Sequence, residues 1–424
     1  MACCYKFNYF FLHSHFLRRK IPFPLRRITV TATAGNSSCK FQSPKFLRSS
    51  RATISKGYCS VSLDSHGDGV VSATSSSAAT FTPAISYGAA QPVQLGSVSN
   101  VGAAANGDSG NGRVMLIDGT SVIHRAYYKL LAKLHHGHLA HADGNGDWVL
   151  MIFSALSFII DVLEFIPSHV VVVFDHDGQN FRHNLYPSYK SNRPPTPDTI
   201  VQGLQYLKAS IKAMSVKVIE VPGVEADDVI GTLALRSVDA GYKVRVVSPD
   251  KDFFQILSPS LRLLRLAPRG DQMVSFGVED FAQKYGGLKP SQFVDLIALS
   301  GDRSDNIPGV NGIGDVYAVQ LISKFGTLER LLESVDQIKE DRIRKALIEN
   351  SEQALLSKEL ALLRSDLPSY MVPFTVNDLL FNKPEDNGSK FNSLLTAISA
   401  YAEGFSADPI IRRASRLWEK LDSK

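Results

Sequence analysis

Nine acidic residues stand where a carboxylate contributes little to packing. Each follows a short apolar run or lies at the start of a predicted helix or turn. Carboxylates gathered in one crevice repel one another, so they stay ionised together only when cations lie among them. The nine are Asp118, Asp175, Glu225, Asp227, Asp228, Asp250, Asp252, Asp302 and Asp305.

The donor atoms of this set are all oxygens. No histidine belongs to it, and the four cysteines of the chain lie at positions 3, 4, 39 and 59, far from any of the nine acids. Oxygen-only sites favour Mg²⁺ or Mn²⁺ over zinc. The residue types therefore predict a magnesium centre in which Mn²⁺ could substitute.

Three of the acids follow apolar runs that read as buried parallel strands. Val114–Ile117 leads to Asp118 and Val170–Phe174 to Asp175, while Lys243–Val247 comes three residues before Asp250. The runs are short, rich in β-branched residues and followed by helical patterns. Ligands of such sheets bind beyond the carboxyl ends of the strands, so we expect three strands to deliver acids to one crevice.

Two further groups of acids leave an ordinary structural reading open. Glu225 to Asp228 opens a predicted helix, where a carboxylate also meets the positive end of the helix dipole. Ser248 to Asp252 could similarly be a turn with a capping residue. Glu225 and Asp228 share a helix face, however, whereas a cap needs one acid. Asp250 and Asp252 can both point into the crevice.

The segment Gly301–Gly314 joins two predicted helices and carries glycines at 309, 312 and 314. Glycines let such a hairpin turn tightly and expose backbone N–H groups beside a helix start, where a phosphate can bind. No strand leads into the turn, so a dinucleotide-binding fingerprint does not fit. We expect a helix–hairpin–helix that grips a nucleic-acid backbone, with K⁺ as a candidate ion at its carbonyls.

The histidines at 135, 136, 138 and 141 lie among Gly and Asp residues, with no carboxylate at a fixed spacing. A solvated loop explains them better than a metal site.

The N-terminal segment differs sharply from the remainder. It holds eleven Lys and Arg residues and no acid before Asp64, so the +5 formal charge of the chain conceals a remainder with 35 basic and 41 acidic residues. An Arg-rich, Ser/Thr-rich segment without acids is typical of a mitochondrial or chloroplast transit peptide. The alternative is a disordered basic tail. No run approaches the roughly 20 apolar residues of a membrane span, so we expect no membrane association.

The pattern along the chain predicts an α/β fold with a mainly parallel sheet flanked by helices and a smaller helical subdomain behind it. We expect a transit peptide over residues 1–71, a flexible linker over 72–112 and a metal-binding α/β domain over 113–286. A helix–hairpin–helix subdomain over 287–380 and a helical tail over 381–424 complete the division.

Taken together, the motifs resemble the 5′→3′ exonuclease domain of bacterial DNA polymerase I and the phage 5′ nucleases of the flap-endonuclease superfamily. The resemblance covers about residues 113–368, and no polymerase domain follows it. The motifs that carry it, in order, are Leu116–Gly119, Val173–Asp175, Phe181–His183, Tyr189–Lys190, Pro195–Pro197, Val221–Asp228, Asp250–Asp252, Gly301–Gly309 and Gly312–Gly314.

This resemblance implies that the nine acids hold two divalent ions at the scissile phosphate. It also places Arg182, Lys190 and Arg193 where basic residues neutralise charge on that phosphate. Tyr189 matches an aromatic on which an unpaired base stacks, with a plain core tyrosine as the equal alternative. Arg125 is a weaker candidate for a phosphate contact. Asn311, Asp315 and Val316 stand where relatives often have lysines, which implies weaker duplex binding.

The implied function is a metal-dependent 5′→3′ exonuclease and flap endonuclease that acts on DNA with 5′ ends, flaps or nicks. RNA–DNA primer junctions in a chloroplast or mitochondrion are the expected setting, with an organellar DNA polymerase as a candidate partner. Two alternatives remain: a non-catalytic DNA-binding factor on the same fold, and an organellar ribonuclease. Clustered acids speak against the first and the hairpin against the second.

Overall fold

The computed structural model describes residues 112–137, 146–266 and 272–423. The predicted transit peptide, most of the predicted linker, His138 and His141 lie outside the described residues. His135 ends the first helix and His136 follows it as its C-cap. None of the helices in the described part of the chain is long and apolar enough to cross a membrane.

Six strands form one sheet in the order β3-β2-β1-β4-β5-β6. All neighbours are parallel except β5 and β6. The strands are β1 (Arg113–Asp118), β2 (His169–Phe174), β3 (Lys217–Glu220), β4 (Lys243–Val247), β5 (Leu261–Leu266) and β6 (Met273–Phe276). The predicted fold class is confirmed.

The register of the central strands brings the acids to one edge. Asp118 at the end of β1 lies opposite Val173 of β2, two residues before Asp175. Ile117 lies opposite Val247 of β4, three residues before Asp250. Since parallel strands end at the same edge, Asp118, Asp175 and Asp250 follow strand ends at that edge, as predicted from the sequence.

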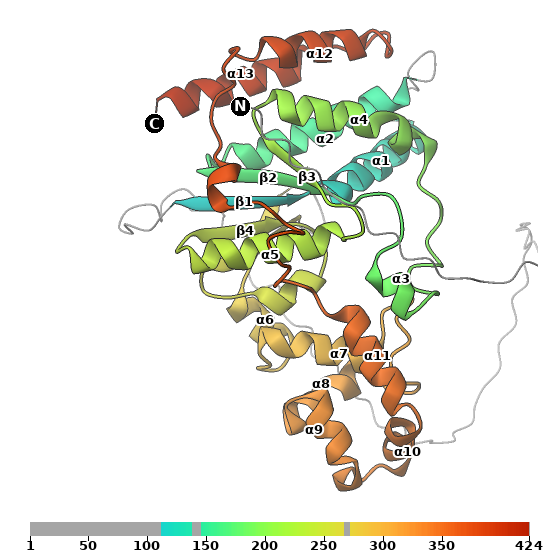
Figure 1. Cartoon of the computed structure of the whole chain (residues 1–424). Coiled ribbons are helices and arrows are strands. Elements are labelled where there is room, and N and C mark those ends of the chain that lie inside the picture. The colour runs from blue at the N-terminus through green and yellow to red at the C-terminus, as the bar shows by residue number, and fades with distance from the viewer. Residues whose placement is uncertain (1–111, 138–145, 267–271, 424) are drawn as a thin grey trace, which may run out of the picture. The chain divides into compact units, whose positions relative to one another are not determined.

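Helices cover both faces of the sheet (Figure 1). One core contains residues of α5 (Ala226–Asp239) and η2 (Asp252–Ile256), and the other contains α1 (Gly119–His135), α2 (Asp147–Leu163) and α4 (Asp198–Ala213). A short helix, α3 (Phe181–Leu185), follows β2. Asn180 caps the start of this helix, because its side chain accepts a hydrogen bond from the N–H of Arg182. The N–H of Asn180 in turn donates to the Nδ1 atom of His183.

The segment after β6 is helical, as predicted. It contains α6 (Val278–Lys284), η3 (Pro290–Gln292), α7 (Phe293–Ser300), α8 (Asp315–Phe325), α9 (Leu328–Glu333), η4 (Val335–Gln337), α10 (Asp341–Glu349) and α11 (Ser351–Ala361). The core of these helices is continuous with the α5 face of the sheet. The subdomain is thus fixed to the same end of the molecule as α5 and η2, which carry site acids.

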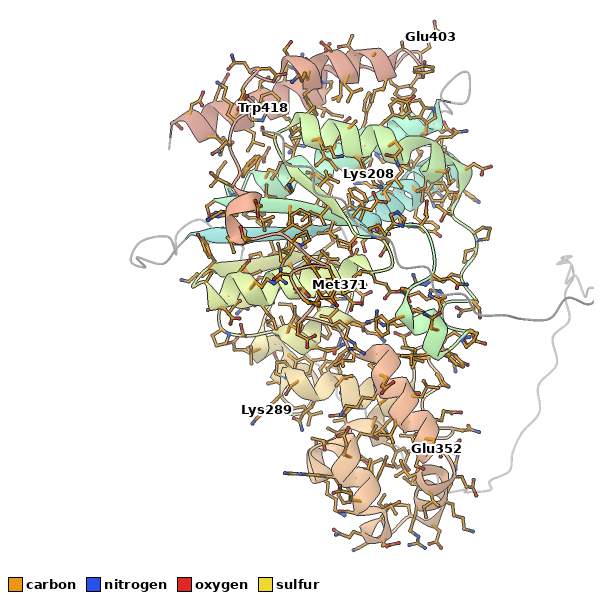
Figure 2. All side chains as sticks on the ribbon, viewed as in Figure 1. Lys208, Lys289, Glu352, Met371, Glu403 and Trp418 are labelled. Carbon is orange, nitrogen blue, oxygen red and sulfur yellow. The ribbon has the colours of Figure 1, made fainter. Side chains whose placement is uncertain are left out.

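The tail forms η5 (Val376–Leu379), α12 (Ser389–Ser399) and α13 (Asp408–Asp422). It packs on α2 and α4, and Trp418, labelled in Figure 2, packs edge-on against Phe391. Trp418 is only 2% exposed. The tail therefore explains why nearly every side chain of α2 is buried, since α2 is covered on one side by the sheet and on the other by these helices.

Candidate active site

Asp118 links the first strand to the first helix. As the N-cap of α1, its carboxylate accepts hydrogen bonds from the N–H of Ser121, at 2.9 Å, and from the hydroxyls of Ser121 and Ser248. Burial raises the pKa of Asp118 to about 6; these hydrogen bonds oppose the rise and the charge of Asp175 adds to it. These hydrogen bonds thus hold the carboxyl group in place, although burial makes its ionised form less favourable.

Asp175 and Asp227 gather around Asp118. Asp175 follows β2 and accepts a hydrogen bond from the N–H of Ala226 at 2.8 Å, which ties the end of this strand to the start of α5. Burial raises the pKa of Asp227 well above its usual value, and the charges of Asp118, Asp250 and Asp175 raise it further. Carboxylates from β1, β2 and α5 therefore converge as predicted.

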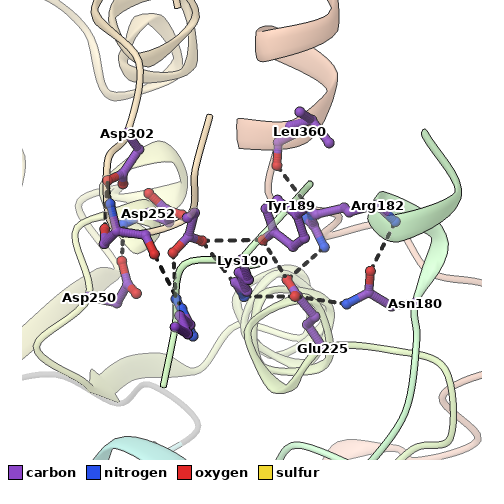
Figure 3. A network of polar contacts seen from close by, with 12 residues as sticks. Asn180, Arg182, Tyr189, Lys190, Glu225, Asp250, Asp252, Asp302 and Leu360 are labelled. Atoms are coloured by element: carbon purple, nitrogen blue, oxygen red, sulfur yellow. Dashed lines mark hydrogen bonds and ion pairs between the residues drawn. The ribbon is translucent and has the colours of Figure 1, made fainter. Parts of the chain in front are cut away.

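A second group of acids lies where η2 meets the hairpin (Figure 3). Burial raises the pKa of Asp252 well above its usual value, with Asp250, Asp305 and Asp302 adding to the effect. The pKa of Asp250 is raised as well, first by burial. At Asp302 burial also acts to raise the pKa, but hydrogen bonds from Ser304 and the ammonium group of Lys251, 3.2 Å away, lower it overall.

Lys190 lies between the two groups. Its Nζ is 2.7 Å from Glu225 and 3.7 Å from Asp305, and these charges raise the pKa of Lys190 despite the opposing effect of burial. Its φ is +54°, in the left-handed region that residues with a Cβ rarely occupy. The N–H of Lys190 donates to the carbonyl of Asp305 at 2.9 Å, which fixes this backbone to the hairpin.

Arg182 lies within a network of buried hydrogen bonds. Its guanidinium forms a bidentate pair with Asp228, at 2.7 and 2.9 Å, and bonds Glu225 at 2.9 Å. Its remaining donors bind the carbonyls of Leu360 and Leu362. Arg182 is 3% exposed and its guanidinium donors are all engaged, so none is left for a phosphate.

Asp228 likewise faces Arg182 and not the other acids. It is 1% exposed, and the N–H of Arg364 donates to it at 2.9 Å. The pair thus joins the start of α5 to α3 and to the end of α11, and the phosphate role of Arg182 and the metal role of Asp228 stay predictions. Two opposite charges taken out of water stabilise the fold only when each satisfies the other.

The burial of Tyr189 favours one of the two alternatives considered from the sequence. It is 3% exposed, and its hydroxyl donates to Glu225 at 3.3 Å and to Asp305 at 3.2 Å. Burial, followed by the charges of Glu225 and Asp305, raises the pKa of Tyr189, so the hydroxyl remains a donor. A buried ring offers no face to a base, and the core alternative considered from the sequence is the better description.

The other two predicted cations remain accessible. Arg193 pairs with Asp305 while half of its side chain stays exposed. Arg125 is partly buried on α1, with its guanidinium 5.1 Å from the ring centre of Phe158. His124, beside it on α1, was not identified from the sequence. Burial and the charge of Arg193 lower its pKa, against the effect of Asp175, so it borders the acids.

The hairpin between α7 and α8 requires its glycines unequally. At Gly309, with φ of +63°, an added Cβ would lie 2.3 Å from the backbone nitrogen of Gly301. At Gly312, with φ of +85°, it would lie 3.2 Å from a guanidinium nitrogen of Arg342. Gly314 has no such requirement, since a Cβ there meets nothing within 4 Å. Arg342, an exposed residue of α10, thus brings a cation to a hairpin that lacks the lysines expected there.

The residues suit a hard divalent cation by the chemistry of their donors. No group of three or more His, Cys, Asp or Glu side chains within the described residues has the geometry of an assembled metal site. The fit comes instead from the carboxylates whose pKa is raised first by burial and further by the charges of neighbouring acids, since a cation between them offsets both costs. Lys190 and Arg193 now neutralise part of the charge from one side.

Comparison with known proteins identifies the family. Residues 113–286 match the family model of the 5′-3′ exonuclease N-terminal resolvase-like domain, and residues 288–387 match that of the 5′-3′ exonuclease C-terminal SAM fold. The chain belongs to the 5′→3′ exonuclease family. Residues 388–424 lie beyond both matches.

Curated relatives include two bacterial DNA polymerases I. That of Bacillus caldotenax is 37% identical over 269 residues, which are 63% of this chain and 29% of the relative. That of Thermus filiformis is 38% identical over 256 residues, 60% of this chain and 29% of the relative. The chain thus spans less than a third of the length of these relatives.

Solved structures with a similar fold include a T5 5′-exonuclease with bound zinc ions, at 22% identity and a TM-score of 0.48, covering 69% of this chain and 100% of that one. The catalytic core of Rad2 in complex with a DNA substrate follows at 17% identity and a TM-score of 0.46, covering 73% and 91%.

Proposed function

We propose that this chain is a divalent-metal-dependent 5′→3′ exonuclease and structure-specific flap endonuclease that hydrolyses DNA phosphodiesters. The observation that carries the proposal is the convergence of acids from β1, β2, α5, η2 and the hairpin, with raised pKa values at Asp118, Asp227, Asp250 and Asp252. A fold keeps such a repulsive cluster only at a cost, which a bound cation offsets.

Two Mg²⁺ ions, for which Mn²⁺ could substitute, are the proposed cofactors. Asp118, Asp175 and Asp227 would hold one, Asp252, Asp302 and Asp305 the other, and Asp250 lies where it can serve both. Such ions supply an activated water and stabilise the leaving oxygen of a phosphodiester. Glu225 is held by Asn180, Arg182 and Lys190, so we assign it to the positioning of Lys190.

Lys190 and Arg193 are the proposed phosphate contacts. Both lie at the hairpin side of the acids, and both pair with Asp305. The oxygens of an incoming phosphate would replace Asp305 as the partners of these two cations. The cations would then lie where negative charge develops during cleavage. Arg182, Asp228 and Tyr189 would act indirectly, by fixing Glu225 and Asp305 in position.

The hairpin is the proposed grip on duplex DNA. The backbone around Gly309 and Gly312 would approach the phosphates, with K⁺ as a candidate ion there, and Arg342 would replace the lysines that the hairpin lacks. With Arg342 beside the hairpin, the weaker duplex binding expected from the missing lysines does not follow.

The proposed setting is DNA replication and repair in a chloroplast or mitochondrion, where RNA-primer junctions are suitable substrates and a DNA polymerase a suitable partner. The support is the acid-free basic leader. A fusion of residues 1–70 to a fluorescent protein should enter one of these organelles. Cytosolic or secreted fluorescence would contradict the proposal.

The decisive experiment offers residues 113–424 a 5′-labelled flap, a nicked duplex and an RNA–DNA hybrid side by side. Cleavage should require Mg²⁺ or Mn²⁺ and stop in EDTA. Asp250→Asn should slow single-turnover cleavage at least about a hundredfold, as expected for the loss of a metal ligand, with DNA binding retained. Asp336→Asn, an exposed acid of the helical subdomain, is the matched control. Cleavage in EDTA at the same rate would refute the metal mechanism.

A further inference from the structure

A cavity of about 370 Å³ lies between α1, α2 and the segment that leads into α13. Its volume falls in the range of small-ligand sites, about 300–1,000 Å³. Part of its wall, from Phe405 to Ile410, comes from the tail beyond residue 387, outside the segments that match the exonuclease family. The cavity therefore depends on a feature that the family match does not cover.

One wall of the cavity is cationic. Arg125, Lys129 and Lys133 recur every four residues on α1, so they lie on one helix face about 6 Å apart along its axis. Asp161 is the acid of the lining, and Arg413 holds it at 2.5 Å. The balance of charge in the cavity is thus positive and suits an anion.

Aromatic side chains also line the cavity. Phe405 of the tail is half-buried, Phe153 and Phe158 of α2 are 9% and 8% exposed, and the guanidinium of Arg125 lies 5.1 Å from the ring centre of Phe158. Serine hydroxyls at 154, 157 and 406 lie among them. Aromatic faces beside cations and hydroxyls suit a flat ring joined to a phosphate.

The cavity shares Arg125 and Phe158 with a second cavity near the candidate active site. Arg125 also lines a smaller cavity, of about 40 Å³, together with Ser121 and Ser248. Both of these serines donate hydrogen bonds to Asp118. A ligand in the larger cavity would therefore border Arg125, which also lines the smaller cavity beside the two serines that hold Asp118.

We propose that this cavity binds one nucleotide unit, with its phosphate on the α1 cations and its base against Phe405 and the α2 rings. The proposal rests on the proposed nuclease function. The nucleotide is either a free 5′-monophosphate, the product of exonuclease action, or a residue of the bound strand. The two sources share the same chemistry, and the experiment separates them.

The test measures binding of dAMP, of deoxyadenosine and of a 5′-phosphorylated oligonucleotide to residues 113–424 in EDTA. Lys129→Gln with Lys133→Gln removes two cations of the cavity, and Phe405→Ala removes the tail ring. Arg416→Gln with Lys420→Gln is the control, because these exposed residues of α13 carry the same charge and are not among the residues that line the cavity. Thermal unfolding verifies that each variant is folded.

The lysine pair should weaken phosphate-bearing ligands about tenfold, as expected for a lost charge-assisted contact, and leave deoxyadenosine unchanged. Phe405→Ala should weaken all three ligands, and the control none. If the lysine variant binds dAMP more weakly than the wild type, the cavity is a site for a free nucleotide. If it binds only the oligonucleotide more weakly, the cavity is a site for a residue of the bound strand. Equal binding by the lysine pair and the control overturns the proposal. Flap cleavage by the wild type in Mg²⁺ reports on the nuclease function independently.

Discussion

Asp227→Asn should make the protein more stable and less active. Asp227 lies among Asp118, Asp175 and Asp250, and both burial and those charges raise its pKa well above the usual value. Asparagine keeps the shape and removes the charge. The variant therefore separates the cost of holding the cluster together from the function that the cluster serves.

The size of the effect can be bounded from Asp118. Its pKa rises from 3.8 to about 6, which corresponds to about 3 kcal/mol for ionising it in the folded protein. Burial is the largest cause, so repulsion by neighbouring acids accounts for a smaller part. We expect Asp227→Asn to increase the free energy of unfolding by about 1–2 kcal/mol at pH 7.5 in EDTA.

The pH dependence has a defined sign. An acid whose pKa is higher in the folded than in the unfolded chain binds protons on folding, so stability without metal should fall as pH rises from about 4 to 6 and level off above. The gain of the variant should thus be smaller at pH 5 than at pH 7.5, because the raised pKa of Asp227 keeps more of its carboxyl groups protonated at the lower pH. Mg²⁺ should stabilise the wild type more than the variant.

Urea unfolding at pH 5 and 7.5, with EDTA and with Mg²⁺, measures all four conditions. Asp336→Asn serves as the control for the loss of a negative charge on an exposed helical segment. If Asp227→Asn is no more stable than the wild type at pH 7.5 in EDTA, the acids do not repel one another as argued. The basis for placing cations among them is then lost.

Three further predictions concern the hairpin, Tyr189 and the tail. Gly312→Ala places a Cβ on a residue with φ of +85°, so it should weaken binding to a nicked duplex about tenfold. Gly314→Ala is the control, because a Cβ there meets nothing within 4 Å. If fluorescence anisotropy gives both variants the same affinity, the hairpin is merely structural. Tyr189→Phe removes one of several donors to Glu225 and Asp305, so it should cost about 1 kcal/mol in urea unfolding with flap binding retained, and weakened flap binding would restore the stacking role. Trp418→Ala should cost about 3–5 kcal/mol, against less than about 0.5 for Arg416→Gln, and a smaller loss would show that the tail is not part of the core.

The sheet and the convergence of its acids could be predicted because both depend on local patterns. A β-branched run that ends in an acid marks a strand and its carboxyl end, and parallel register then aligns those ends without further information. Asp118, Asp175 and Asp250 follow this rule directly.

The roles of Arg182, Asp228 and Tyr189 could not be predicted because they depend on distant contacts. The donors of Arg182 end on the carbonyls of Leu360 and Leu362, about half the folded chain away, and no local pattern marks a carbonyl as an acceptor. Arg342 was missed for the same reason, since it reaches Gly312 from another helix. Residue type indicated a basic or aromatic role, and only the fold shows which of these side chains are buried.

The hairpin joins the proposed grip on DNA to the acids mechanically. One segment between α7 and α8 carries Asp302 and Asp305 at its start and the glycines that approach DNA at its end. Gly309 packs against Gly301 so closely that an added Cβ would lie 2.3 Å from its nitrogen, and Lys190 is tied to the carbonyl of Asp305. A duplex that shifts the hairpin must therefore also shift two acids and a cation of the candidate active site. Recognition of the duplex and assembly of the catalytic groups would then be parts of one conformational step.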